Sequence, residues 1–125
     1  MMKMFLFFSH RLTQEQMEEA KGYGVEEFVT LPSDLQYRFS NVPPDLENLD
    51  DYVRPFLLFL FEKSARGDFV LVQGDFGLVH KIVCFSRSVG LVPLYATTER
   101  IAVEKEIEGK FVKVSQFKHV RFREY

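Results

Sequence analysis

Apolar runs alternate along the chain with amphipathic stretches, and this alternation predicts strands separated by helices. The first run is continuous and stops at Ser9 and His10, as expected of a central strand that is buried on both faces. Three more apolar runs of similar length follow it. The four predicted strands cover residues 4–8, 27–31, 68–72 and 91–95.

The intervening stretches carry helix-start signals. Thr13 precedes Gln16 by three residues, which is a capping-box pattern, and Ser33 with Gln36 repeats it. The longest predicted helix spans residues 46–63, where apolar residues recur at spacings of three and four, and Pro55 is expected to kink or restart it. A fourth helix is predicted over residues 78–88, where Cys84 is expected to be a buried thiol.

After residue 100 the pattern changes to alternating polar and apolar positions. It predicts a hairpin of residues 101–107 and 110–116 around a Glu108-Gly109 turn, and residues 117–125 either finish the sheet or lie along a partner. The whole chain, residues 1–125, is therefore predicted to be one α/β domain. We expect a Rossmann-like three-layer sandwich with a mostly parallel sheet in the order 2-1-3-4 and a C-terminal antiparallel hairpin.

Composition narrows the classes of partner. The 125 residues include 14 Phe, 5 Tyr and no Trp, more aromatic surface than one small core needs, which favours an oligomer interface. A net charge of −2 disfavours a long nucleic acid but not a small anionic ligand. The single cysteine excludes an intramolecular disulfide, and no segment has the length of a membrane span, so the cytoplasm is the expected location.

Polar residues that are able to do chemistry follow three of the predicted strands. An open parallel sheet binds ligands beyond the carboxyl ends of its strands, where the strand order reverses, and this places three loops at one crevice. Each residue also has a structural explanation: Ser9 can bond its own turn, His10 can be a plain surface residue and Asp75 can cap a helix. The loops are Ser9-His10-Arg11, Gln73-Gly74-Asp75-Phe76-Gly77 and Thr97-Thr98-Glu99-Arg100.

Two common kinds of site are not indicated. The glycine turn matches neither a Walker loop nor a dinucleotide fingerprint. No spacing brings His and carboxylate residues together as metal ligands, so neither a metal nor a cofactor is expected. The basic residues of the C-terminal segment, Lys118, His119, Arg121 and Arg123, fit a charged edge strand as well as a phosphate site.

Four strand ends together resemble a known protein family. The sequence FVLVQGDFG at residues 69–77 and YATTER at residues 95–100 are the most specific parts, and LFFSH at 6–10 and LPSD at 31–34 accompany them. The chain resembles, over its whole length, small Csx-type accessory proteins of type III CRISPR systems. These are taken to be ring nucleases with a CARF-like Rossmann fold, which degrade cyclic oligoadenylate messengers as homodimers without a metal.

The resemblance implies an expected function and a role for each candidate residue. Cyclic tetra-adenylate is the expected ligand, and a ribose 2′-OH attacks the adjacent phosphorus to leave a 2′,3′-cyclic phosphate. Ser9, His10 and Asp75 are the expected catalytic residues. The expected ligand contacts are Arg11, Gln73, Gly74, Phe76, Gly77, Thr97, Thr98, Glu99 and Arg100. The alternatives left open are a binding module without catalysis and a plain interaction protein.

Overall fold

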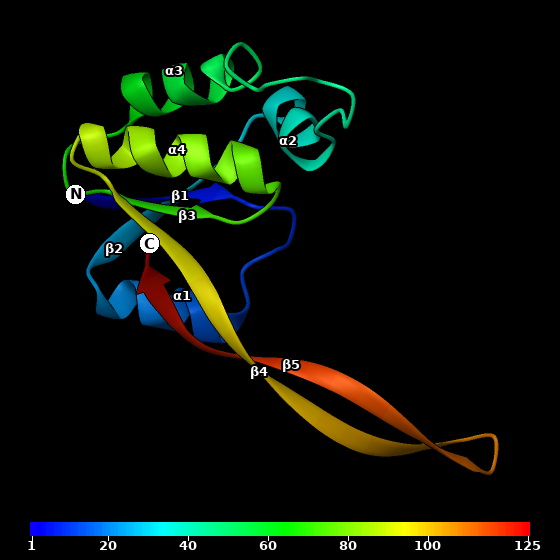
Figure 1. Ribbon diagram of the computed structural model, residues 1–125. Helices are drawn as coiled ribbons and strands as arrows, with labels where there is room; N and C mark the ends of the chain where they lie inside the picture. Colours follow the sequence, from blue (N-terminus) through cyan, green and yellow to red (C-terminus); the bar gives the residue numbers. More distant parts are fainter.

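The computed structural model describes residues 1–125 and contains one five-stranded mixed sheet (Figure 1). The strands lie in the order β2-β1-β3-β4-β5; the first four are parallel to their neighbours, and β4 and β5 pair antiparallel. The strands are β1 Met2–Phe7, β2 Val25–Thr30, β3 Phe69–Val72, β4 Val92–Ile107 and β5 Lys110–Glu124. The expected α/β class with a mostly parallel sheet and a C-terminal antiparallel pair is therefore confirmed.

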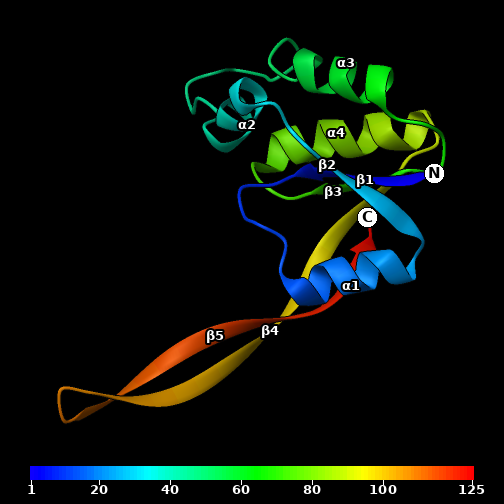
Figure 2. The ribbon, with the colours of Figure 1, turned by 180° about the vertical axis from the view of Figure 1, so that it is seen from behind.

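Helices lie on both faces of the sheet. Helix α1 covers one face, and α2, α3 and α4 gather on the other, as the two opposite views show (Figure 1 and Figure 2). The helices are α1 Gln14–Gly22, α2 Ser33–Ser40, α3 Arg54–Lys63 and α4 Phe76–Ser88. No helix is long and apolar enough to cross a membrane.

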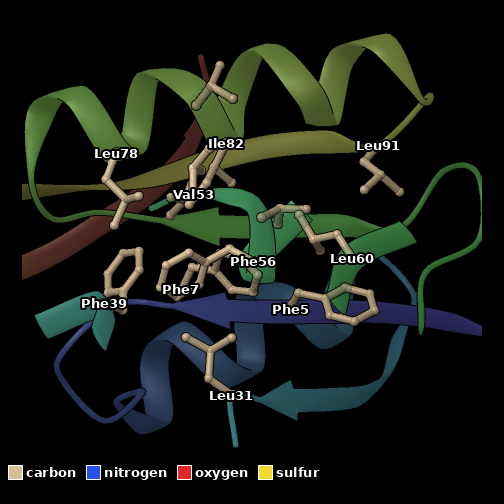
Figure 3. Close-up of a cluster of buried hydrophobic side chains, with 13 residues drawn as sticks. Phe5, Phe7, Leu31, Phe39, Val53, Phe56, Leu60, Leu78, Ile82 and Leu91 are labelled. Carbon is tan, nitrogen blue, oxygen red and sulfur yellow. The ribbon is translucent and has the colours of Figure 1, made fainter. Parts of the chain in front are cut away.

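Alternate residues of the central strands supply the two halves of the core. Phe5 and Phe7 of β1 point toward α3 and α4, where Phe7 contacts Phe56 and Phe5 contacts Phe59 (Figure 3). Met4 and Phe8 point to the opposite face, toward Ala20 of α1. Because side chains alternate along a strand, one apolar run fills both halves. Many of the Phe residues are thus core residues, with Phe7, Phe39 and Phe56 in mutual ring contact.

Two local predictions about the helices are wrong, and a third is right in part. The segment 46–63 is helical only from Arg54, so residues 46–53 do not form the predicted helix, but the predicted restart at Pro55 is confirmed: Pro55 occupies the first turn of α3, where a missing N–H costs nothing. Helix α2 has Pro32 as its N-cap and no side-chain cap, so Ser33 does not form a capping box. Cys84 is exposed on α4, and its Sγ lies 3.8 Å from His80 Nε2. The capping box between Thr13 and Gln16 is confirmed, with both hydrogen bonds present.

The C-terminal hairpin is longer than predicted. The fourth strand and the first hairpin strand form one strand of 16 residues, β4, and β5, of 15 residues, pairs with it from Leu94 to Ile107. The part from Thr98 to His119, which we call the arm, projects away from the helices (Figure 1). None of its residues belongs to either hydrophobic cluster. The predicted loop Thr97–Arg100 is therefore wrong, because those residues continue the strand.

Candidate functional site

The carboxyl ends of β1 and β3 lie side by side at the point where the strand order reverses. Strand β1 pairs with β2 on one side and with β3 on the other. The Gln73 N–H donates to the Phe7 carbonyl at 3.0 Å, which extends the β1–β3 ladder past the end of β3. The segments that follow these strands, Ser9-His10-Arg11 and the turn 73–77, therefore leave the sheet next to each other, as predicted.

Helix α2 holds Ser9 in place. Ser9 Oγ lies 2.8 Å from Ser40 Oγ, and Gln36 Nε2 donates both to Ser40 Oγ at 3.1 Å and to the Phe8 carbonyl at 3.2 Å. This chain of hydrogen bonds fixes the hydroxyl at the end of β1. The sequence analysis missed Gln36 and Ser40. In the sequence, the one indication of a role for these two residues was that they follow the LPSD segment, residues 31–34, which is part of the family resemblance.

His10 and Arg11 are exposed and form no side-chain hydrogen bond within the chain. The His10 ring packs edge-on to Phe8, with 6.2 Å between ring centroids. Both residues line a cavity of about 420 Å³, which we call the β1 cavity, together with Ser9, Met17, Phe28 and Gln36. An unpaired imidazole and an unpaired guanidinium beside a hydroxyl form a suitable group for binding and protonating a phosphate ester.

The glycine turn is fixed by the structure around it. Asp75 is the N-cap of α4, and its Oδ2 accepts from the Leu78 N–H at 3.0 Å. Gln73 Oε1 accepts from the Ala96 N–H at 2.9 Å, so this turn also holds β4. At Gly74, a Cβ atom would come within 3.0 Å of the Phe39 ring, which explains why glycine fits there. Asp75 Oδ1 and the Gln73 amide nitrogen have no partner within the chain.

A second cavity, of about 580 Å³, lies between α4, the end of β3 and the first part of β4; we call it the α4 cavity. Phe76 at its edge is 94% exposed, and Tyr95 and Tyr125 stand 4.8 Å apart between ring centroids. Burial, and next the neighbouring Tyr95, raise the pKa of Tyr125, so its hydroxyl stays protonated and donates to the Val72 carbonyl. The lining residues are Gln73, Gly74, Phe76, Val79, His80, Val83, Arg87, Tyr95 and Tyr125.

The predicted site residues do not all meet in one crevice. The β1 cavity is on the α1 face of the sheet and the α4 cavity is on the opposite face, because their strand residues belong to alternate sides. Thr97 bonds the Arg121 backbone, and Arg100 donates to Ser115 Oγ at 3.0 Å on the arm. Thr97, Thr98, Glu99 and Arg100 line neither cavity. Arg87, Tyr95 and Tyr125 were not predicted as site residues; Arg87 lies near the end of α4, and Tyr95 and Tyr125 are distant in sequence from the glycine turn.

A third group of polar residues ties α1 to the base of the arm. Glu19 accepts from His119 Nε2 at 2.6 Å, from the Phe122 N–H at 2.8 Å and from the Tyr23 hydroxyl. Burial acts to raise the pKa of Glu19, but the hydrogen bonds from Tyr23, Phe122 and His119 outweigh it and hold that pKa below its usual value. His119 is thus a structural contact here, and its Nδ1 atom is buried without a partner.

Elsewhere, no three His, Cys, Asp or Glu side chains come together in a way that could hold a metal ion. The ionisable groups of the candidate site are instead single residues at the two strand ends. The arrangement provides an imidazole and a guanidinium at each of two cavities, His10 and Arg11 at the β1 cavity and His80 and Arg87 at the α4 cavity, which aromatic rings also line.

The chain was compared with known proteins. The family described as "Uncharacterized protein MJ1673 family" matches residues 2–123. The "Uncharacterized protein MJ1673" of Methanocaldococcus jannaschii is 46% identical to this chain over 126 residues, which cover 100% of this chain and 98% of the relative. No solved structure matches.

Proposed function

This chain belongs to the MJ1673 family, and we propose that it is a ring nuclease that opens a cyclic oligoadenylate, with cyclic tetra-adenylate as the first candidate. The fold would then be a CARF-like, Rossmann-like three-layer sandwich, and the activity would switch off type III CRISPR signalling. The observation that carries the proposal is the position of Ser9, His10 and Arg11. They are exposed at the switch point of the sheet, directly beside the glycine turn that follows β3, and His10 and Arg11 have no hydrogen-bond partner within the chain.

The proposed reaction needs no metal. His10 Nε2 or Nδ1 takes the proton of a ribose 2′-OH, and the 2′ oxygen forms a bond to the adjacent phosphorus. The bond from phosphorus to the 5′ oxygen breaks, and that oxygen takes a proton from a solvent water, while His10 later releases the proton it accepted to the resulting hydroxide; a 2′,3′-cyclic phosphate and a 5′-OH remain. Arg11 and Ser9 neutralise and position the phosphate, and Asp75 Oδ1 accepts a hydrogen bond from the ribose.

The α4 cavity suits an adenine base of the same ligand. Phe76 offers an open aromatic face, and Tyr95 and Tyr125 form an apolar wall beside it. The unpartnered Gln73 amide nitrogen can donate to a ring nitrogen of the base. Stacking on an aromatic side chain contributes ~1–3 kcal/mol per base. The ring would therefore extend across the carboxyl edge of the sheet, with a phosphate at the β1 cavity and a base at the α4 cavity.

The test is incubation of the purified protein with cyclic tri-, tetra- and hexa-adenylate in excess EDTA, with products identified by mass spectrometry. Linear products that end in a 2′,3′-cyclic phosphate are expected. Arg11→Ala and His10→Ala are each expected to lower turnover ~100-fold. Arg54→Ala, which changes another exposed arginine far along the chain on α3, is the matched control and should be silent. Wild-type activity in both site variants would refute the assigned chemistry.

A binding module without catalysis is the second candidate. It is favoured by one observation: Ser9 and Asp75 already have hydrogen-bond partners within the chain, Ser40 and Leu78, which leaves His10 as the only unengaged candidate for proton transfer. A sensor or sponge would bind the ring tightly and return it unchanged. Calorimetric titration of the folded protein with each ring separates these cases, since binding without product supports the module and absence of both refutes the ligand class.

A further inference from the structure

The two faces of the arm differ in character. Directly opposed residues of an antiparallel pair point to the same face, so the register of β4 and β5 assigns each side chain. One face, which we call the valine face, has Val103 opposite Val114 at its centre and more β-branched residues on either side. The other face has as many charged residues, Arg100, Glu104, Glu106 and Lys113, but its only large apolar side chains are Phe111 and Phe117, which lie far apart along the arm. The apolar residues of the valine face are Ile101, Val103, Ile107, Val112 and Val114.

The chain leaves most of the valine face uncovered; only at the base of the arm do Thr13 and Glu15, at the start of α1, line a cavity together with Ile101 and Gln116. Ile101, Ile107 and Val112 are 39%, 52% and 42% exposed, and no residue of the arm enters either core cluster. A two-stranded hairpin by itself is marginally stable in water, and a third layer or strand is needed to stabilise it. From Thr98 to Ile107 the arm is roughly 30 Å long at ~3.4 Å per residue, so this apolar stripe is extensive.

The charged residues of the valine face indicate which partner packs against it. Near the base of the arm, Glu99 stands opposite Lys118, so this end is nearly neutral. Near the tip, Lys105 and Lys110 are both positive, and no carboxylate lies at that end of the valine face. If two valine faces packed against each other with both arms running in the same direction, base beside base, Lys105 and Lys110 of both copies would lie together at the tips. If they met tip to base, Lys110 of one copy would lie near Glu99 of the other, and the apolar centres would coincide.

We propose that the occupant is a second copy of this chain, and that two arms pack valine face to valine face, tip to base, about a two-fold axis near Val103 and Val114. An isologous contact of this kind is self-complementary. It brings the lysine-bearing tip of each arm to the base of its partner's arm. That base continues directly from Ala96, which Gln73 holds at the candidate site. The inference concerns the assembly and does not depend on the ring-nuclease activity.

The first experiment measures the mass of the protein in solution by light scattering after size-exclusion chromatography. We expect a dimer for the wild type and a monomer for Val103→Asp. Ala102→Asp is the matched control, because it introduces the same charge one residue away on the opposite face, and it should remain a dimer. Retained thermal unfolding of each variant shows that the body is folded. A monomeric wild type, or a dimer that survives Val103→Asp, would overturn the proposal.

The second experiment tests the orientation. Glu99→Lys alone and Lys110→Glu alone should each weaken the dimer at least tenfold at low salt, and the double variant should recover most of that loss.

The third experiment is a disulfide cross-link. Val103→Cys in a Cys84→Ser background should give a covalent dimer on mild oxidation, because the proposed two-fold axis passes near this residue. Loss without recovery in the double variant, together with no cross-link, would instead place the arm on another surface or another partner and refute this arrangement.

Discussion

At the scale of single residues, the main finding is that several candidate catalytic groups already have a structural role. Ser9 is held by Ser40, Gln73 by Ala96, and Asp75 caps α4. His10 and Arg11 are the exceptions, since no partner within the chain uses them. A substitution at the engaged positions therefore changes stability and chemistry together, and an experiment has to separate the two.

Asp75 allows this separation. Asp75→Ala removes the N-cap of α4 and is expected to lower the free energy of unfolding by about 1 kcal/mol. Asp75→Ser keeps a capping oxygen and should restore that stability, because serine and aspartate cap about equally well. If Asp75 Oδ1 contacts the ribose, turnover of cyclic tetra-adenylate falls ~100-fold in both variants. Urea unfolding and product formation measure the two effects, and full activity in Asp75→Ser would assign the residue to capping alone.

Glu19 predicts a dependence of stability on pH. Its pKa is lowered in the folded protein, so its contribution is present above the unfolded value near 4.5 and is lost as the pH falls through the lower folded pKa. Glu19→Gln should therefore be less stable than the wild type at pH 7, by about 1–3 kcal/mol, and the difference should shrink in acid. Glu18→Gln, on the exposed side of α1, serves as the control in parallel urea titrations. A difference that is constant with pH would contradict this role.

At the scale of elements, the helices follow their local signals only where the tertiary contacts agree. The capping box at Thr13 forms because the Thr13 and Gln16 side chains each accept a hydrogen bond from the other residue's backbone N–H at the start of α1. The same pattern at Ser33 did not form, because Pro32 already fixes the entry to α2 as its N-cap. The apolar periodicity of residues 46–63 continued through a segment that does not form a helix before Arg54. Periodicity records which residues are buried, and an irregular segment can bury them as well as a helix.

Helix α3 provides a test of how this burial stabilises the protein. Phe56 is fully buried against Phe7 and Phe39, whereas Phe61 on the same helix is 71% exposed. Phe56→Ala should lower the free energy of unfolding by about 3–5 kcal/mol, because it leaves a cavity in the core. Phe61→Ala should change it by less than about 0.5 kcal/mol. Chemical denaturation followed by circular dichroism measures both, and equal losses would mean that the helix is not packed as described.

At the scale of the whole molecule, the chain divides into a packed body and a projecting arm (Figure 1). All residues of both hydrophobic clusters belong to the body. The candidate site is at the carboxyl edge of the sheet, and β4 leaves the body from that same edge to form the arm. The site and the arm are therefore neighbours, although no residue of the arm belongs to the core that positions the site.

A shortened chain tests this division. Replacing residues 99–118 by Asn-Gly would join the opposed residues Thr98 and His119 through a two-residue hairpin turn and keep the contact of His119 with Glu19. This variant should remain folded and unfold cooperatively. If the arm forms the dimer, the unfolding midpoint should also become independent of protein concentration, unlike that of the wild type. Failure to fold would show that the arm stabilises the body.

The sequence by itself determined the strand and helix alternation, the parallel core of the sheet and the positions of the segments that follow β1 and β3. These depend on local hydrophobic pattern and on the rule for the carboxyl edge of a sheet, both of which are readable along the chain. Only the tertiary structure decided that Thr97–Arg100 continue a strand, that Cys84 is exposed, and that Tyr95 and Tyr125 share a cavity with Phe76. These features depend on which distant segments pair, since β5 supplies the hydrogen bonds that keep β4 extended past the body.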